Sequence, residues 1–415
     1  MHFRVLFACS IFYGNLAQAS PSLVSLTPDA TDAQAARPTC ILNPRGDELH
    51  DDGRDAYPKS YGCRDGGVLV IPAGTTFMIR SPVNFDWCNG CEIQVEGTIK
   101  MSDNYEYWNE KPEMMSIYGM KNLTIRSVTG QGLIDGNMAV TYQRFRWPDW
   151  FGNLPTLIHI NGSSNVYISN LKIKNAPDKF IRVDGASSDI SFSDLDFVVE
   201  GQYFNLAYTM GHSIGLEVLN SSRITASNLN VKFSSDKPDA KVGTCVTIGE
   251  NTDTVEVSNV TCNAGDGVMV KFVSYSGAAT IAKNIHVSNL TANVSTATGI
   301  RFAVGERPEL RNITWDGVTV LDGNAATAEF CWQDVPSWTA RCNIANEITR
   351  ANLTGIYWKN IKGKVDPNPS LRCANSKSFC DYHFQNWTVS NVSRPLSIRR
   401  QVPVPSEHYL SLGIE

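Results

Sequence analysis

Cysteines carry the first pattern in this 415-residue chain that could do chemistry. Cys88 and Cys91 are separated by two residues, a spacing that occurs in zinc and redox sites. No second Cys-x-x-Cys and no pair of histidines lies close by in the sequence, so we expect neither a metal nor another cofactor there. Ten cysteines instead form sequence-local pairs, which their proximity predicts to be disulfide bonds of an exported protein. The pairs are Cys40/Cys63, Cys88/Cys91, Cys245/Cys262, Cys331/Cys342 and Cys373/Cys380.

Asn-x-Ser/Thr sequons form the second chemical pattern. In an exported protein each one is a possible acceptor for an N-linked glycan. Asparagine is also a favoured turn residue, so the sequons predict many exposed turns, of which only some carry a glycan. They begin at Asn122, Asn161, Asn220, Asn259, Asn289, Asn293, Asn312, Asn352, Asn386 and Asn391.

Residues 1–19 have the composition of a secretory signal peptide. Arg4 supplies the positive charge, residues 5–12 are apolar, and Ala17-Gln18-Ala19 is a small-residue cleavage site. The apolar run is too short to cross a bilayer, and no later stretch is long and apolar enough. We therefore expect cleavage before Ser20, an extracellular protein without a membrane anchor, and loss of the eleventh cysteine, Cys9, with the signal.

The net charge excludes one class of partner. It is −5, with an isoelectric point near 5.9, so the chain lacks the basic footprint of a nucleic-acid-binding protein. An anionic polysaccharide remains compatible, because its binding depends on the local charge of a cleft rather than on the total. We expect the protein to be a monomer.

A repeated phrase predicts the elements that position these groups. The phrase consists of an apolar-x-apolar triplet, a polar residue, then Asn, Asp or Gly, then a second apolar-x-apolar triplet, as in residues 166–173, 224–231 and 285–292. Each copy has the alternation of two short strands, joined by a bend at a residue that tolerates a left-handed backbone. The apolar residue after the bend recurs at Leu171, Leu195, Leu229, Val260, Leu290, Val318 and Ile361, in steps of 24, 34, 31, 30, 28 and 43 residues.

One apolar row per copy cannot be buried alone, so neighbouring copies must stack. The prediction is an all-β protein with a single-stranded right-handed parallel β-helix. A β-sandwich would also alternate, but it would not repeat one phrase at about thirty residues. We expect a signal peptide at 1–19, an N-terminal extension at 20–39, the β-helix at 40–397 and a tail at 398–415.

One stretch of the sequence resembles a known enzyme family. Gly130-Gln-Gly-Leu-Ile-Asp-Gly136 is similar to the Gly-x-Gly-x-Ile-Asp-Gly stretch of glycoside hydrolase family 28, and residues 147–150 and 155–160 resemble the segments that follow it there. The resemblance covers residues 40–380. It implies a pectin-lyase-like solenoid and a cofactor-free hydrolase of α-1,4-galacturonosyl linkages in cell-wall pectin, of the polygalacturonase or galacturan 1,4-alpha-galacturonidase type.

The chemistry of that family depends on four short motifs. An inverting glycosidase needs one acid to protonate the leaving oxygen and one carboxylate to activate water. The family carries them, with the groups that bind substrate, in Asn-Thr-Asp-Gly-x-Asp, Asp-Asp before a Cys, Gly-His-Gly after a second Cys, and Arg-Ile-Lys. The Cys245/Cys262 pair sets the register, which places the four motifs at 212–217, 243–245, 265–267 and 301–303.

Most of the family's catalytic groups are absent at those positions. Ile214 stands where the first motif has Asp, Thr244 stands before Cys245, and Asp266 replaces the histidine. Arg301 is retained, whereas Ala303 replaces the lysine. Deleting a general acid or base costs roughly 10²–10⁴-fold in rate, so we do not expect the family's own mechanism.

Two functions stay open. The first is a pectin-directed glycosidase with displaced acids, in which Asp266 and Glu217 are catalytic and Arg301 and His212 bind substrate. Asp236 and Asp239 are further acids beside the same coils, and the additions at 232–241 and 320–356 favour a closed, exo-type cleft. The second is a catalytically inactive homologue that binds pectic polysaccharide or oligogalacturonide. The structural alternative is that Asp266 is a turn acid and Glu217 an inward-facing or loop acid.

Overall fold

A computed structural model describes residues 37–45, 49–109, 111–138, 154–200, 213–233, 243–272, 279–303, 307–332, 350–363, 369–371, 373 and 377–389. The described residues all belong to one compact unit, which begins at Arg37, and no residue of Met1–Ala36 is described. The expected signal peptide and C-terminal tail therefore lie outside the described residues, and the proposed domain boundaries remain predictions.

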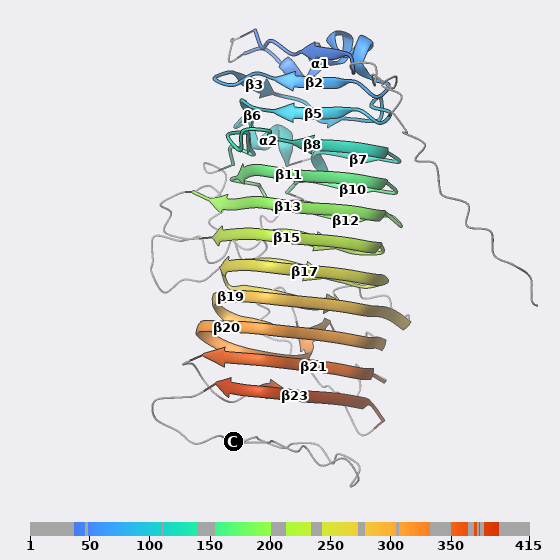
Figure 1. Ribbon diagram of the computed structural model, residues 1–415, viewed down its shortest axis with the longest axis vertical. Helices are drawn as coiled ribbons and strands as arrows, with labels where there is room; N and C mark the ends of the chain where they lie inside the picture. The colour runs from blue at the N-terminus through green and yellow to red at the C-terminus, as the bar shows by residue number, and fades with distance from the viewer. Residues whose placement is uncertain are drawn as a thin grey trace, which may run out of the picture. The chain divides into compact units, whose positions relative to one another are not determined.

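The strands stack in parallel, each pairing with the strand one coil before it and one coil after it (Figure 1). They form three sheets. The long sheet contains β1 (Thr39–Ile41), β2 (Val68–Ile71), β5 (Glu92–Val95), β8 (Lys121–Arg126), β11 (Ser164–Lys174), β13 (Ser188–Val199), β15 (Ser222–Phe233), β17 (Thr252–Asn263), the first parts of β19 (Ala279–Ala303) and β20 (Arg307–Trp332), β21 (Asn352–Gly363) and β23 (Phe379–Val389).

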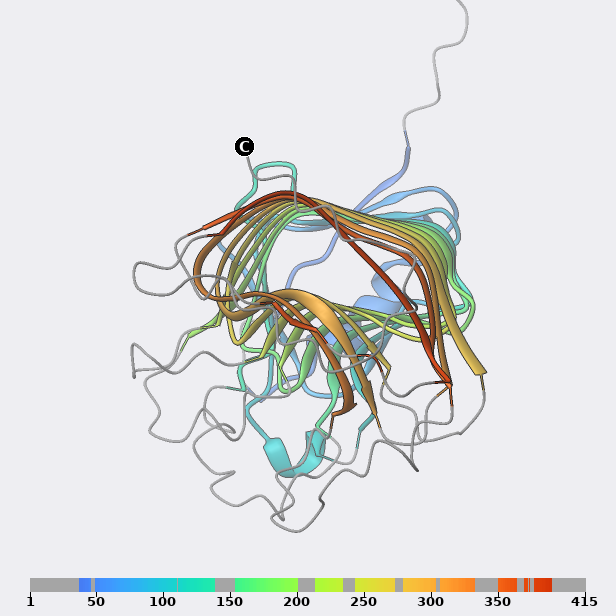
Figure 2. The ribbon, with the colours of Figure 1, turned by 90° about the horizontal axis from the view of Figure 1, so that it is seen from below.

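The second sheet, here named the site sheet, contains β4 (Val83–Asn84), β7 (Glu113–Tyr118), β10 (Thr156–Asn161), β12 (Lys179–Asp184), β14 (Ile214–Val218), β16 (Thr244–Ile248), β18 (Asp266–Phe272), the last parts of β19 and β20, and β22 (Ser370–Leu371). The third contains β3 (Thr76–Ile79), β6 (Thr98–Met101) and β9 (Leu133–Asp135), and it continues into the end of β11. Viewed along the stack, the strands superimpose as successive coils (Figure 2).

The predicted repeat positions are direct neighbours in the structure. Leu171 pairs with Leu195, which pairs with Leu229, and the row continues through Val260, Leu290, Val318 and Ile361. Every one of these side chains is at most 2% exposed. Stacking therefore buries the apolar row as the repeat requires. The prediction of a right-handed parallel β-helix is confirmed.

The bends between the two strands of each phrase have the expected backbone. Asn228, Asn259 and Asn289 have φ of 55°, 54° and 54°, a left-handed conformation that asparagine tolerates better than most residues. Their amides also join neighbouring coils: Asn259 donates to the Oδ1 of Asn228 at 3.1 Å, and Asn289 donates to that of Asn259 at 3.2 Å. Asn259 and Asn289 begin sequons and are exposed. Whether any sequon carries a glycan remains a prediction, and Asn391 lies outside the described residues.

In the described ranges, three short helical segments accompany the strands: α1 (Asp52–Lys59), the 3-10 helix η1 (Tyr61–Cys63) and α2 (Tyr105–Trp108). The buried Asp52 ties α1 to the solenoid, because its carboxylate accepts hydrogen bonds from the backbone N–H groups of Arg45 at 2.9 Å and Met78 at 3.0 Å. None of the helices in the described part of the chain is long and apolar enough to cross a membrane.

Four of the expected cysteine pairs are bonded in the structure: Cys40–Cys63, Cys88–Cys91, Cys245–Cys262 and Cys373–Cys380. The fifth pair includes Cys342, which lies outside the described residues. Cys245 lies on β16 and Cys262 near the end of β17, directly before β18. This disulfide therefore links β16 to the end of β17, next to the strands that carry the candidate site.

Candidate functional site

The first residues of successive site-sheet strands bring the compared motif positions together. Ile214 pairs with Thr244, and Thr244 pairs with Asp266, across β14, β16 and β18. Thr296 of β19 continues the row. Ile214 and Thr244 cannot act as acids or bases in this role. Asp266 is the one ionisable group in this row of four.

Asp266 lies in a cluster of paired charges. Its carboxylate makes ion pairs with the Lys271 ammonium at 3.2 Å and with the Arg301 guanidinium. Its side chain is 13% exposed, and those of Lys271 and Arg301 are 7% and 11% exposed. Both cations lie within ion-pair distance of the same carboxylate oxygen of Asp266. Asp266 is thus an ion-paired residue rather than a solvated turn acid.

Arg301 connects Asp266 to a second acid. Its Nε lies 3.0 Å from a carboxylate oxygen of Glu329, whose side chain is 39% exposed. The other oxygen of Glu329 accepts a hydrogen bond from the Thr327 hydroxyl at 2.9 Å. The predicted substrate-binding arginine is therefore paired with two carboxylates in the structure. A substrate carboxylate would have to compete with one of them, and Glu329 is the more accessible.

Lys271 was not predicted from the sequence. It lies on β18 directly opposite Arg301 of β19, and its ammonium donates to the Thr244 hydroxyl at 2.7 Å. The repeat contains a signal for it, since 271 and 301 are separated by the same 30 residues as Val260 and Leu290. Lys271 and Arg301 together supply two cations at adjacent coils, although Ala303 replaces the family's lysine on β19.

Glu217 lies in a different environment from Asp266, because burial rather than close ion pairing dominates it. It alternates with the core residues Leu216 and Val218 on β14, so it points away from the core, and yet it is only 5% exposed. It is a strand residue, neither inward-facing nor in a loop. Burial raises the pKa of its carboxyl above the ordinary value, and the nearby cations Lys179 and Arg182 oppose that shift only in part.

Glu217 does not join the Asp266 cluster. Its ionic partner is Arg182, whose Nη1 lies 3.6 Å from Oε2, and that oxygen accepts no hydrogen bond. In sheet order β16 stands between β14 and β18, so Glu217 and Asp266 are two coils apart. At about 4.8 Å per strand, their backbones are about 10 Å apart along the stack.

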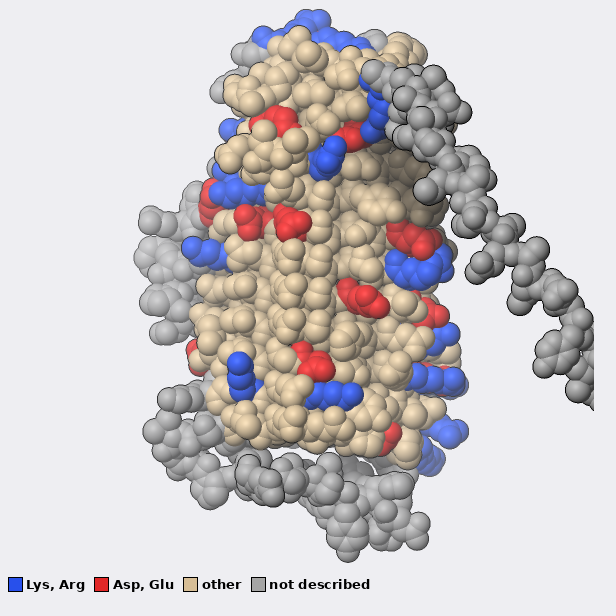
Figure 3. All heavy atoms as spheres, viewed as in Figure 1, with Lys and Arg blue, Asp and Glu red and all other residues tan. Residues whose placement is uncertain are grey.

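The charged row continues from Glu217 toward the N-terminus. His159, Arg182 and Glu217 are in register on β10, β12 and β14. Arg182 makes a two-pronged contact with Asp184, at 3.0 and 2.6 Å. Burial lowers the pKa of His159, although Glu113 lies 3.4 Å from its Nδ1. In contrast, charged residues are scattered over the face of the long sheet seen in Figure 3.

Several predicted groups cannot be placed. His212, Asp236 and Asp239 lie outside the described residues, as does most of the additions expected to close the cleft. Within the described part of the chain, no group of three His, Cys, Asp or Glu side chains is arranged to hold a metal ion. The described site therefore consists of two separated acids, Glu217 and Asp266, each beside two cations.

Comparisons with known proteins agree with this architecture. The sequence profile described as Glycosyl hydrolases family 28 matches residues 66–405. The chain is 32% identical to a probable endo-xylogalacturonan hydrolase A of Aspergillus flavus, over 90% of both chains. It is 30% identical to the endo-xylogalacturonan hydrolase A of Aspergillus tubingensis, over 85% of this chain and 84% of the other.

A solved structure shows the same solenoid. The crystal structure of the endo-xylogalacturonan hydrolase from Aspergillus tubingensis superimposes with a TM-score of 0.75 at 26% identity, covering 85% of this chain and 93% of the other. An exopolygalacturonase from Thermotoga maritima, with a TM-score of 0.57 at 13% identity, shares the fold. On the profile match, which spans most of the β-helix, this chain belongs to family 28 of the glycosyl hydrolases.

Proposed function

We propose that the protein is a secreted glycosidase acting on an acidic pectic polysaccharide, in which Glu217 is the general acid and Asp266 the general base. One observation carries this proposal: the two carboxyls lie on the same sheet in opposite environments. Burial raises the pKa of Glu217, whereas the Asp266 carboxylate makes ion pairs with Lys271 and Arg301. Two carboxyls in such different environments are a usual sign of acid and base roles.

The chemistry is an inverting hydrolysis. Protonated Glu217 gives its proton to the glycosidic oxygen as the bond to the anomeric carbon breaks, and ionised Asp266 takes a proton from the water that attacks the opposite face of the sugar. Inverting pairs are about 6.5–9.5 Å apart, against about 5–5.5 Å for retaining pairs. Glu217 and Asp266 are offset by two coils and by three residues along the strands, which excludes the narrow spacing of a retaining pair.

The substrate class follows from the cations and the relatives. Lys271 and Arg301 suit a uronate carboxylate, which would replace the exposed Glu329 as a partner of Arg301. The relatives named above are endo-xylogalacturonan hydrolases. We therefore place xylogalacturonan ahead of unsubstituted polygalacturonate as the substrate. This revises the polygalacturonase-type activity that the motif resemblance implies.

The test is reducing-sugar release from xylogalacturonan, polygalacturonate and rhamnogalacturonan at pH 4–6. We expect Glu217→Gln and Asp266→Asn each to lower the rate by roughly 10²–10⁴-fold. Asp253→Asn is the matched control, because this half-exposed acid lies on the long sheet. Undiminished turnover by Glu217→Gln would exclude it as the proton donor. A product with retained anomeric configuration would exclude the inverting mechanism.

A second function is supported by other observations. Ile214 and Thr244 cannot replace acids, and the low exposure of Glu217 keeps it from a glycosidic oxygen unless its surroundings open. These features favour a non-catalytic protein that binds pectic oligosaccharides. A non-catalytic binding function predicts no turnover on any of the three polymers. It also predicts that calorimetry detects binding of oligogalacturonate and that Arg301→Ala abolishes this binding.

A further inference from the structure

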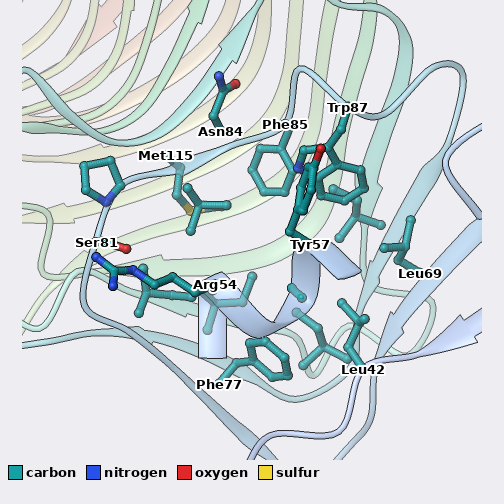
Figure 4. A pocket seen from close by; sticks show the side chains of 18 of the residues that line it. Leu42, Arg54, Tyr57, Leu69, Phe77, Ser81, Asn84, Phe85, Trp87 and Met115 are labelled. Atoms are coloured by element: carbon teal, nitrogen blue, oxygen red, sulfur yellow. The ribbon is translucent and has the colours of Figure 1, made fainter. Parts of the chain in front are cut away.

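The first coils form a partly open cavity that the function proposed above does not use. It has a volume of about 290 Å³ and lies between α1 and the strands β2 to β4 (Figure 4). Most of its lining is aliphatic or aromatic, including Leu69 and Ile79. Phe77, Phe85, Trp87 and Tyr57 supply four rings to the wall.

The cavity exists because a helix, rather than another coil, covers this end of the solenoid. In later coils large rings fill the core: Phe180 stacks on Phe233 at 5.3 Å, and Trp315 on Trp358 at 5.2 Å. The first coil has no earlier coil to pack against, and α1 takes that place. The helix contributes the small residues Gly53 and Ala56 to the lining, with Tyr57 at one side.

The lining defines the chemistry of a ligand. Tyr57 and Trp87 meet edge to face, with centroids 6.4 Å apart and planes at 85°, and Phe85 lies 6.0 Å from Trp87. Such walls favour a flat ring. The lining residues that carry a charge at neutral pH are Arg54 and Asp86, and Arg54 already lies 3.5 Å from the Asp51 carboxylate. An anionic ligand would lose hydration, and the one cation in the lining, Arg54, already has the Asp51 carboxylate as its partner.

We propose that this cavity is a binding site for an uncharged aromatic molecule of one or two fused rings. An apolar cavity of about 150 Å³ stays dry and binds benzene, so a space about twice as large has room for a fused bicycle. The site is independent of Glu217 and Asp266, which lie on later coils.

The experiment uses the mature, full-length protein with 2-naphthol as the probe and naphthalene-2-sulfonate as its charged counterpart. Thermal shift and calorimetry measure binding. We expect 2-naphthol to raise the melting temperature and to bind at least about tenfold more tightly than the sulfonate, because the sulfonate must shed its hydration. Hydrolysis assayed in parallel should not change.

Two variants fill the cavity from opposite walls: Ala56→Phe from α1 and Val83→Phe from β4. Each should remove the 2-naphthol shift, whereas Ile281→Phe, a partly exposed position on β19 outside the lining, should keep it. Using two variants keeps the test valid if one of them fails to fold, as checked by circular dichroism. The proposal is overturned if the natural protein shows no shift, if the sulfonate binds equally well, or if a folded, filled variant keeps the shift.

Discussion

At the scale of the residue, Glu217 and Asp266 show that the same functional group, a carboxyl, behaves differently in different surroundings. Both are carboxyls on strands of the site sheet. Asp266 has two close cations, whereas Glu217 has low exposure and only a 3.6 Å contact with Arg182. Desolvation favours the neutral form and nearby opposite charge the ionised form. Substitutions at the two residues are therefore expected to have different effects.

Glu217 should make stability depend on pH. Its pKa is raised above the ordinary value of 4.5, so the folded state binds its proton more tightly than the unfolded chain does. That contribution is complete below pH 4.5 and is lost as the pH rises through the folded-state pKa. Glu217→Gln cannot ionise, so its melting temperature should rise relative to that of the natural protein between pH 4 and pH 8. A difference that stays constant over this range would contradict the prediction.

Asp266→Asn should separate the two proposed functions. Removing the carboxylate leaves Lys271 and Arg301 close together without their shared anion, which should destabilise the fold by about 3 kcal/mol, the lower end for a broken buried pair. If Asp266 is the base, turnover falls. If the protein is a binder, the vacated cations should bind oligogalacturonate more tightly. Urea denaturation measures the loss of stability, and calorimetry measures the binding of oligogalacturonate. A stability of Asp266→Asn equal to that of the natural protein would contradict the expected destabilisation.

At the scale of the element, the bends do two jobs: they turn the chain, and they link neighbouring coils. Asn259 has a φ of 54° and takes part in two amide hydrogen bonds, one as donor and one as acceptor. A residue with a β-carbon but no amide is strained there by roughly 1–2 kcal/mol and also loses these bonds. Glycine would lose the bonds without the strain.

Two substitutions at Asn259 should therefore differ. We expect Asn259→Ala to lower the free energy of unfolding by about 2 kcal/mol and Asn259→Gly by about 1 kcal/mol, since each lost bond contributes about 0.5–1.5 kcal/mol. Urea denaturation in a Thr261→Ala background, which abolishes the sequon, removes any effect of a glycan at Asn259. If alanine proved no worse than glycine, the strain argument would be wrong.

At the scale of the whole molecule, the coils form one continuous core, and covalent bonds reinforce it locally. The Cys245–Cys262 bond closes a segment with a sequence separation of 17. Replacing both cysteines by serine should cost about 3 kcal/mol, because the unfolded chain regains loop entropy. The matched control, Cys373→Ser with Cys380→Ser, opens a separation of 7 and should cost about 2 kcal/mol.

Calorimetry of these variants also tests the expected domain boundaries. A single β-helix predicts one unfolding transition that shifts as a whole when the Cys245–Cys262 bond is removed. Two transitions, with only one of them sensitive to this bond, would contradict the prediction that residues 40–397 form one unit.

The sequence by itself determined the coil. Strand alternation and turn chemistry are local properties, and in a solenoid each copy packs on its nearest neighbours, so the positions of Leu171 and its equivalents predicted their contacts. The motif resemblance, in the register set by Cys245 and Cys262, singled out Ile214, Thr244 and Asp266, and the structure places them in one row. Neither the repeat nor the resemblance identified Lys271, although the 30-residue step to Arg301 was present.

Only the tertiary structure decided what each charged group meets. The pairing of Asp266 with Lys271 and Arg301, the contact of Glu217 with Arg182, and the cavity under α1 all depend on side chains from different coils. Their separation in sequence varies with the segments inserted between strands, and a pKa depends on burial and on the distances to every nearby charge. The alternating pattern of one strand contains neither quantity, because both arise only when the coils stack.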